Sequence, residues 1–241
     1  MQTYTASGRS RWPWIIGGAV ILIAVIVAII YGTSHGTTTT ADPTTTASPS
    51  ASPSATATTQ PTQGGSDGND DAAPTGCLGG ANRDADMVLA AQKAAPHTTS
   101  GAVEVAAAFF RWAIRYPYPA TDEADAMSAT IMSANAPASF KDIAGAYAHG
   151  NDISGGQVPE GTDFYLSTVP GRWLVESSST SDQITVDVSA AFVVADALSP
   201  TKSASEAFIM VWEDGGWKVD REQQADTAAL AAGGTLFTAG C

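Results

Sequence analysis

The chain has 241 residues, of which 44% are hydrophobic and only 15% are charged. Its 11 basic and 24 acidic side chains give a formal net charge of −13 at pH 7. An acidic domain repels nucleic acid phosphates and anionic lipid surfaces, so we expect no direct nucleic acid binding by the folded part. Plain solubility is the alternative role of this charge.

An uninterrupted apolar run from Ile15 to Tyr31 is the first element of the chain. It holds no charged residue and no proline, and as a helix it is just long enough to cross a hydrocarbon core of about 30 Å. Aromatic residues flank it, as is common at the headgroup layer. We expect a transmembrane signal anchor over residues 14–32 after a cytoplasmic tail, residues 1–13. A cleaved signal peptide is the alternative.

The basic residues around the anchor predict its orientation. Arg9 and Arg11 precede the run, and no Lys or Arg follows it before Arg83. Positive charge favours the cytoplasmic side, so everything after the anchor is expected outside the cell membrane. The predicted localisation is therefore a single-pass membrane protein with an extracytoplasmic C-terminal domain.

Residues 33–76 consist mostly of Thr, Ser, Ala, Pro, Gly and Asp. Such a segment cannot bury enough apolar surface to offset its ordering entropy, so we expect a disordered linker. Its composition also suits O-glycosylation, and an unmodified spacer is equally compatible with it. Residues 77–241 remain for one folded extracytoplasmic domain.

Only two cysteines occur in the chain, Cys77 and Cys241, and they bracket the folded part. Thiols outside the membrane tend to be oxidised, so we predict a disulfide between them. Two free thiols or an intermolecular pair are the alternatives. The three histidines show no ligand spacing with each other or with cysteine, so no metal or cofactor is expected.

The folded part begins with helical periodicity and continues with strands. The expected helices cover residues 83–95, 99–115, 121–133 and 137–149. The expected strands cover residues 164–169, 172–178, 183–196, 205–213 and 217–221, and a short helix over 225–232 follows. Helices followed by hairpin-linked strands predict an α+β fold, with N-terminal helices packed on a curved antiparallel sheet.

The last hairpin, from Val211 to Val219, reads Val-Trp-Glu-Asp-Gly-Gly-Trp-Lys-Val and follows an amphipathic helix and long strands. Over Gly101–Arg221 this pattern resembles the nuclear transport factor 2-like (cystatin-like cone) superfamily. The resemblance implies a sheet that wraps around a helix to form a cone.

With its tail, anchor and external domain, the chain resembles in layout the inner-membrane scaffold subunit of type IV secretion and conjugation systems. Proteins associated with actinobacterial lipid-import complexes share that layout, and the Ala/Thr/Asp-rich, Lys-poor composition is similar to that of high-GC actinobacteria. A larger linker than the secretion scaffold usually has is the main departure.

Candidate chemistry is sparse. No nucleophile elbow, phosphate loop, zinc motif or dinucleotide fingerprint occurs in the sequence. Asp187 is the candidate pocket residue, because it lies mid-strand with Thr185 and Ser189 on the same face. Acid–base work would require a histidine partner such as His97. A solvent-facing polar stripe is the alternative interpretation of this face.

A basic and aromatic cluster in an otherwise acidic domain is the candidate interface: Arg111, Trp112, Arg115, Tyr116 and Tyr118. Arginine and tyrosine are enriched at protein interfaces. The alternative is one arginine face plus core aromatics around a proline-rich turn.

These features together predict a non-enzymatic membrane-anchored scaffold of a cell-envelope complex, in a conjugation or type IV secretion-like channel. Its external domain is expected to contact other envelope proteins and copies of itself, as a homo-oligomer. An extracytoplasmic module that binds a small molecule or lipid is the first alternative. A cyclase- or isomerase-like enzyme is the second.

Overall fold

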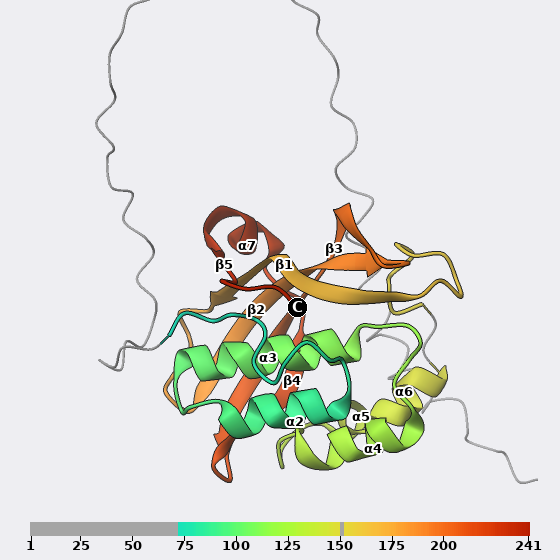
Figure 1. The fold of residues 1–241 in the computed structure, drawn as a ribbon. Helices are drawn as coiled ribbons and strands as arrows, with labels where there is room; N and C mark the ends of the chain where they lie inside the picture. Colours follow the sequence, from blue (N-terminus) through green and yellow to red (C-terminus); the bar gives the residue numbers. More distant parts are fainter. Residues whose placement is uncertain (1–71, 150–151) are drawn as a thin grey trace, which may run out of the picture.

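A computed structural model of the chain describes residues 72–149 and 152–241 (Figure 1). These residues form an α+β domain in which helices precede a curved, five-stranded antiparallel sheet, as predicted. The anchor predicted at residues 14–32 and the linker up to residue 71 lie outside the described residues. Within the described part, every helix is too short or too polar to span a membrane.

The helices of the first half lie close to their predicted positions. Their bounds are α2 (Ala85–Ala94), α3 (Thr99–Ala113), α4 (Thr121–Thr130), α5 (Ala138–Lys141) and α6 (Ile143–His149). The fourth predicted helix is broken in two, because Asp142 leaves the helical conformation with φ −86° and ψ 63°. Its carboxylate then accepts a hydrogen bond from Gly145 N at 2.9 Å in the first turn of α6.

Helix α3 is the centre of the domain. Every residue from Gly101 to Trp112 is buried, so the apolar stripe predicted from its periodicity widens to its whole circumference. Helix α2 packs on one side of it, and strands of the sheet pack on the other. Figure 1 shows α3 lying between α2 and the sheet.

The sheet has the strand order β4-β3-β2-β1-β5. Its strands are β1 (Phe164–Val175), β2 (Gln183–Val194), β3 (Ala197–Glu213), β4 (Gly216–Gln223) and β5 (Thr235–Leu236). The two strands predicted before residue 178 are one strand, β1, whose pairing with β2 shifts between Ser167 and Arg172. Strand β3 starts earlier than predicted, because a tight turn at Ala195 and Asp196, both at positive φ, follows β2 directly.

The two faces of the sheet have different covers. On the inner face, Val186, Val188 and Phe208 belong to the main core with α3. On the outer face, helix α7 (Thr227–Gly233) packs over part of β1 and β2, where Leu230 joins a small second cluster. The rest of the outer face has no helix over it in the described part (Figure 1).

The predicted disulfide is confirmed. Cys77 and Cys241 are bonded, with their Cα atoms 5.6 Å apart. Upstream of Cys77, the carbonyl of Pro74 accepts a hydrogen bond from Thr238 N at 3.1 Å. The contacts of the folded domain therefore begin at Pro74, before the predicted boundary at residue 77.

Removing the disulfide is expected to destabilise the domain strongly. The bond closes a loop with a sequence separation of 164 residues, and such bonds typically contribute about 2–5 kcal/mol. The double variant Cys77→Ser/Cys241→Ser should lose that amount in urea unfolding. Reductant should lower the stability of the wild type by the same amount and leave the variant unchanged. Equal stability of wild type and variant would contradict this assignment.

Candidate functional site

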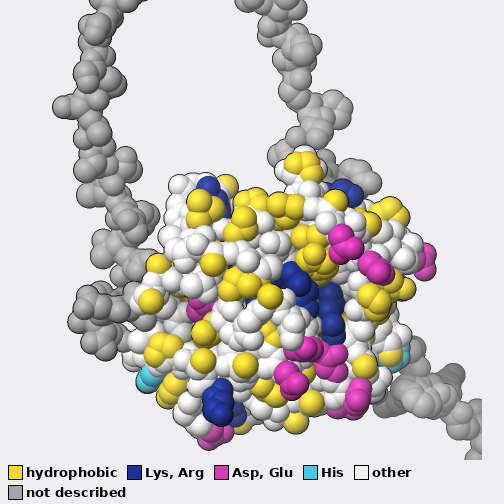
Figure 2. Space-filling view, viewed as in Figure 1, with side chains coloured by type: hydrophobic (Ala, Val, Ile, Leu, Met, Phe, Trp, Pro, Cys, Tyr) yellow, Lys and Arg dark blue, Asp and Glu magenta, His cyan; other side chains and the backbone are white. Residues whose placement is uncertain are grey.

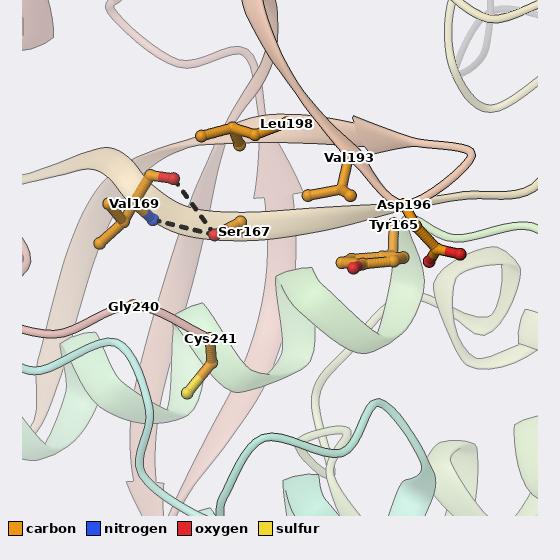
Figure 3. Close-up of a pocket in the computed structure, with 8 residues that line it drawn as sticks. All are labelled: Tyr165, Ser167, Val169, Val193, Asp196, Leu198, Gly240 and Cys241. Atoms are coloured by element: carbon orange, nitrogen blue, oxygen red, sulfur yellow. Dashed lines mark hydrogen bonds between the residues drawn. The ribbon is translucent and has the colours of Figure 1, made fainter.

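An open groove of about 530 Å³ lies on the uncovered part of the outer sheet face (Figure 3). Strands β1, β2 and β3, the β2–β3 turn and the C-terminal tail form it. Its lining residues are Tyr165, Ser167, Val169, Val193, Asp196, Leu198, Gly240 and Cys241.

Apolar exposure distinguishes this groove from the remaining surface. Val169 and Leu198 are 44% and 49% exposed, and only one further large hydrophobic residue in the described part, Leu236, is comparably exposed. Strand alternation turns the groove residues of β1 outward, and α7 covers a different part of that face. In Figure 2 hydrophobic side chains are visible in the upper part of the view, where the sheet lies, as well as over the helices below.

Two charged residues border the groove. Asp196 comes from the positive-φ turn between β2 and β3 and is exposed, with Tyr165 beside it in Figure 3. The guanidinium of Arg83 lies over the ring of Tyr165, 3.8 Å from its centroid. The groove thus combines an apolar floor with a carboxylate at one end.

The candidate interface residue Arg111 instead lies in the interior, where it has no exposed surface. Its guanidinium donates hydrogen bonds to the carbonyls of Gly76 at 3.3 Å, Gly80 at 3.1 Å and Asn82 at 3.1 Å. The role of Arg111 is therefore to hold the N-terminal loop, residues 75–82, against α3. Burial lowers the pKa of Arg111 to about 10.

Trp112 also lies in the interior and not at the predicted interface, since its side chain is fully buried. Its indole Nε1 donates to Glu123 at 2.7 Å, and Arg115 contacts the same carboxylate at 2.7 Å. Only three of the five predicted interface residues reach the surface, and they are half-buried: Arg115, Tyr116 and Tyr118. The alternative of core aromatics around a proline-rich turn describes this region better.

Asp187 does not face the interior between the sheet and α3. It lies on the outer sheet face, 1% exposed, and its Oδ1 accepts a hydrogen bond from Asp226 N at 2.9 Å, next to α7. Burial raises its pKa. His97 contacts Asp182 at 2.9 Å and stacks on Trp212, so the acid–base pair of Asp187 and His97 is not formed.

Two glutamates that the sequence analysis missed lie on the inner face. Glu206 is opposite Val188, and Glu222 is opposite Phe208, so both side chains share the face that packs on α3. Both are half-buried, and neither has a hydrogen-bond partner among residues 72–149 and 152–241. Side chains two residues apart in a strand share a face, so the inward positions of Phe208 and Met210 could have predicted that Glu206 also faces inward.

The surroundings of Glu206 and Glu222 disfavour the charged form of both carboxyl groups. Burial, and secondarily the charge of Glu222, raises the pKa of Glu206 to about 8, and burial raises the pKa of Glu222 to about 7. Burial also raises the pKa of Tyr147 on α6, with a smaller contribution from Glu222. The rings of Tyr147 and Tyr118 stack at 5.7 Å. In the described residues, no three His, Cys, Asp or Glu side chains converge as metal ligands.

Comparisons with protein-family models, with curated proteins and with solved structures find no match for this chain. The resemblance to the nuclear transport factor 2-like superfamily and to secretion scaffolds therefore stays a prediction.

Replacing Arg111 is expected to destabilise the domain, because the buried carbonyl of Gly76 and the carbonyls of Gly80 and Asn82 lose their donor, and Glu104 loses a nearby positive charge. Arg111→Met should cost about 3 kcal/mol of unfolding free energy in urea. The exposed Lys93→Met on α2 is the control and should change stability by less than about 0.5 kcal/mol. Equal effects would contradict the role assigned to Arg111.

The glutamate pair is expected to make stability fall as pH rises. A carboxyl whose pKa is raised on folding stabilises the fold when protonated, and that contribution is lost between its unfolded value, near 4.5, and about 8. Glu206→Gln/Glu222→Gln should therefore be more stable than wild type at pH 8 by several kcal/mol, and similar to it at pH 4.5. Thermal unfolding against pH measures this, with exposed Asp125→Asn as control. A parallel pH dependence of both proteins would refute it.

Proposed function

We propose that this protein is a single-pass, membrane-anchored component of a cell-envelope complex, which binds a partner protein through the outer face of its sheet. The open apolar groove carries this proposal. It exposes Val169 and Leu198, whereas most other large apolar side chains of the described domain are buried. Exposed apolar surface with a polar rim is typical of protein interaction sites.

The way the N-terminal loop is held supports a tethered role. Glu104 on α3 accepts hydrogen bonds from Thr75 Oγ1 at 2.7 Å, Gly76 N at 3.1 Å and Leu78 N at 3.2 Å. The disulfide joins Cys77 in the same loop to the end of the chain. A domain fastened at its N-terminal loop in this way suits attachment through the apolar run at residues 15–31.

The partner is proposed to present an apolar side chain next to a basic group. Val169 and Leu198 offer the apolar contact, and the exposed Asp196 lies in the same groove. The chain as a whole carries a formal net charge of −13, which also favours a basic segment over an acidic one. We place this partner among the other envelope proteins of a conjugation or secretion-like channel.

A photo-crosslinking amino acid in place of Leu198, in the full-length protein in its native membrane, tests this proposal. The expected result is a crosslinked product with one other envelope protein, abolished by the additional substitution Val169→Asp. The same crosslinker at the exposed Asp125 on α4 is the matched control and should give no such product.

Two outcomes would overturn the proposal. Equal crosslinking from positions 198 and 125 would show that the groove is not a preferred contact. A product containing only this chain would replace the envelope partner with a second copy of the protein.

The inner-face glutamates favour a second candidate function, the binding of a small molecule with a positively charged group. Glu206 and Glu222 have no hydrogen-bond partner among the described residues, and Tyr147, whose ring stacks on that of Tyr118, is close enough to Glu222 for its pKa to be affected. Carboxylates and aromatic faces both attract cations.

Tetramethylammonium chloride, compared with sodium chloride at equal ionic strength, is the probe for this second function. It should raise the melting temperature of the wild type at pH 8 and leave Glu206→Gln/Glu222→Gln unchanged. Equal shifts in both proteins would exclude a specific site for this class of cation.

A further inference from the structure

Helix α7 is a small cover on the outer face of the sheet. It has seven residues, from Thr227 to Gly233, and only Leu230 among them is fully buried. Leu230 and Ala225 pack on Ala207 in a cluster separate from the main core, with Leu174 beside them. The cover is therefore held by few apolar contacts, and most of its residues are exposed.

A polar atom without a partner lies beneath this cover. Asp187 is 1% exposed, and its Oδ2 is buried without a hydrogen-bond partner in the described residues. Only Oδ1 is satisfied, by Asp226 N at the start of α7. A buried carboxylate with an unpaired oxygen is costly, whereas the protonated carboxyl group carries no net charge into the interior.

The charges around Asp187 do not neutralise it. On the outer sides of the surrounding elements, the charged groups are Arg172 of β1, Glu176 directly after β1, Arg221 of β4 and Asp226 before α7. Arg172 donates to the carbonyl of Gly234 at 2.6 Å, and Arg221 pairs with Asp220 at 2.8 Å. On the adjacent strand β3, the residue opposite Asp187 is the uncharged Ala207.

We propose that α7 is a lid on the outer face of the sheet, and that it swings away when the carboxyl group of Asp187 loses its proton. Closed, the lid buries the neutral carboxyl group. Open, it lets water reach the carboxylate. Burial raises the pKa of Asp187; the hydrogen bond from Asp226 N opposes this rise, and the charges of Glu176 and Asp226 add to it. The net effect is a raised pKa, so the closed state is favoured at low pH and weakened as pH rises.

The C-terminal end of α7 is built of glycine. Gly233 is the last residue of the helix and Gly234 follows it, where a Cβ would lie 2.5 Å from the carbonyl of Leu230. Beyond them, β5 and the Cys77–Cys241 disulfide hold the tail, so the lid stays attached at both ends. Opening would uncover Ala207 and Leu174, and add apolar area to the same sheet face that carries the groove.

Hydrogen exchange of the full-length protein in detergent, measured from pH 4 to pH 8 and corrected for intrinsic exchange rates, tests the lid. The protection of residues 227–233 should fall by up to about tenfold per pH unit above the pKa that Asp187 has in the open state. Protection of α2, which lies on the other side of α3, is the internal reference and should stay constant. In Asp187→Asn the protection of residues 227–233 should no longer depend on pH.

If Asp187→Asn fails to fold, α3 will lose its protection from hydrogen exchange. In that case a second variant provides the test. Glu176→Gln removes an acidic neighbour that raises the pKa of Asp187 in the closed state, so the charged carboxylate costs less under the closed lid. The loss of protection with rising pH should therefore level off at lower pH and be smaller in total than in the wild type. Asp125→Asn on α4 is the matched control and should show the wild-type loss. Protection of residues 227–233 that does not change with pH in the wild type would overturn the proposal, as would an undiminished loss of protection in Glu176→Gln.

Discussion

The grip of α3 on the N-terminal loop is the interaction on which the rest of the domain depends. Glu104 accepts backbone hydrogen bonds from the loop, and Arg111 donates to three of its carbonyls. Both side chains project from a helix that is buried on all sides. Burying two charges is tolerable only because the loop satisfies nearly all of their polar atoms, so the loop and the helix require each other.

The packing of α3 and the N-terminal loop on the sheet also determines which face of the sheet is free to bind a partner. Because α3, α2 and the N-terminal loop lie on one side of the sheet, the inner face of the sheet belongs to the core. A partner that contacts the sheet therefore has to bind its outer face or one of its edges. The loop is in turn bonded to the C-terminal tail through Cys77 and Cys241, and that tail forms one wall of the groove. The groove and the attachment point of the preceding chain are thus joined covalently.

Local patterns predicted most of the fold. Periodicity and caps located α2, α3 and α4, alternation located β2 and β4, and the expected extracytoplasmic location predicted the disulfide. The turn at Ala195 and Asp196 escaped prediction, because neither residue is the glycine that usually marks positive φ. The break at Asp142 escaped because a single aspartate caps a helix as readily as it continues one.

The site was harder to predict, because its residues depend on contacts between distant segments. Period-two alternation shows that Asp187 shares a face with Thr185 and Ser189, but a helix forty residues later decides that this face is covered. Arg111 is a surface residue by type, and its burial depends on a loop roughly thirty residues upstream. The groove has no sequence motif, since it arises where α7 stops covering the sheet.

The most direct test of this account compares the solvent protection of the full-length protein in its native membrane with that of the same protein purified in detergent. The account predicts added protection in the membrane at residues 165–169 and 193–198, which form the groove, and none on α2 or α6. Added protection on α6 and around Glu222, with the groove unchanged, would contradict it and would move the working surface to the inner face of the sheet.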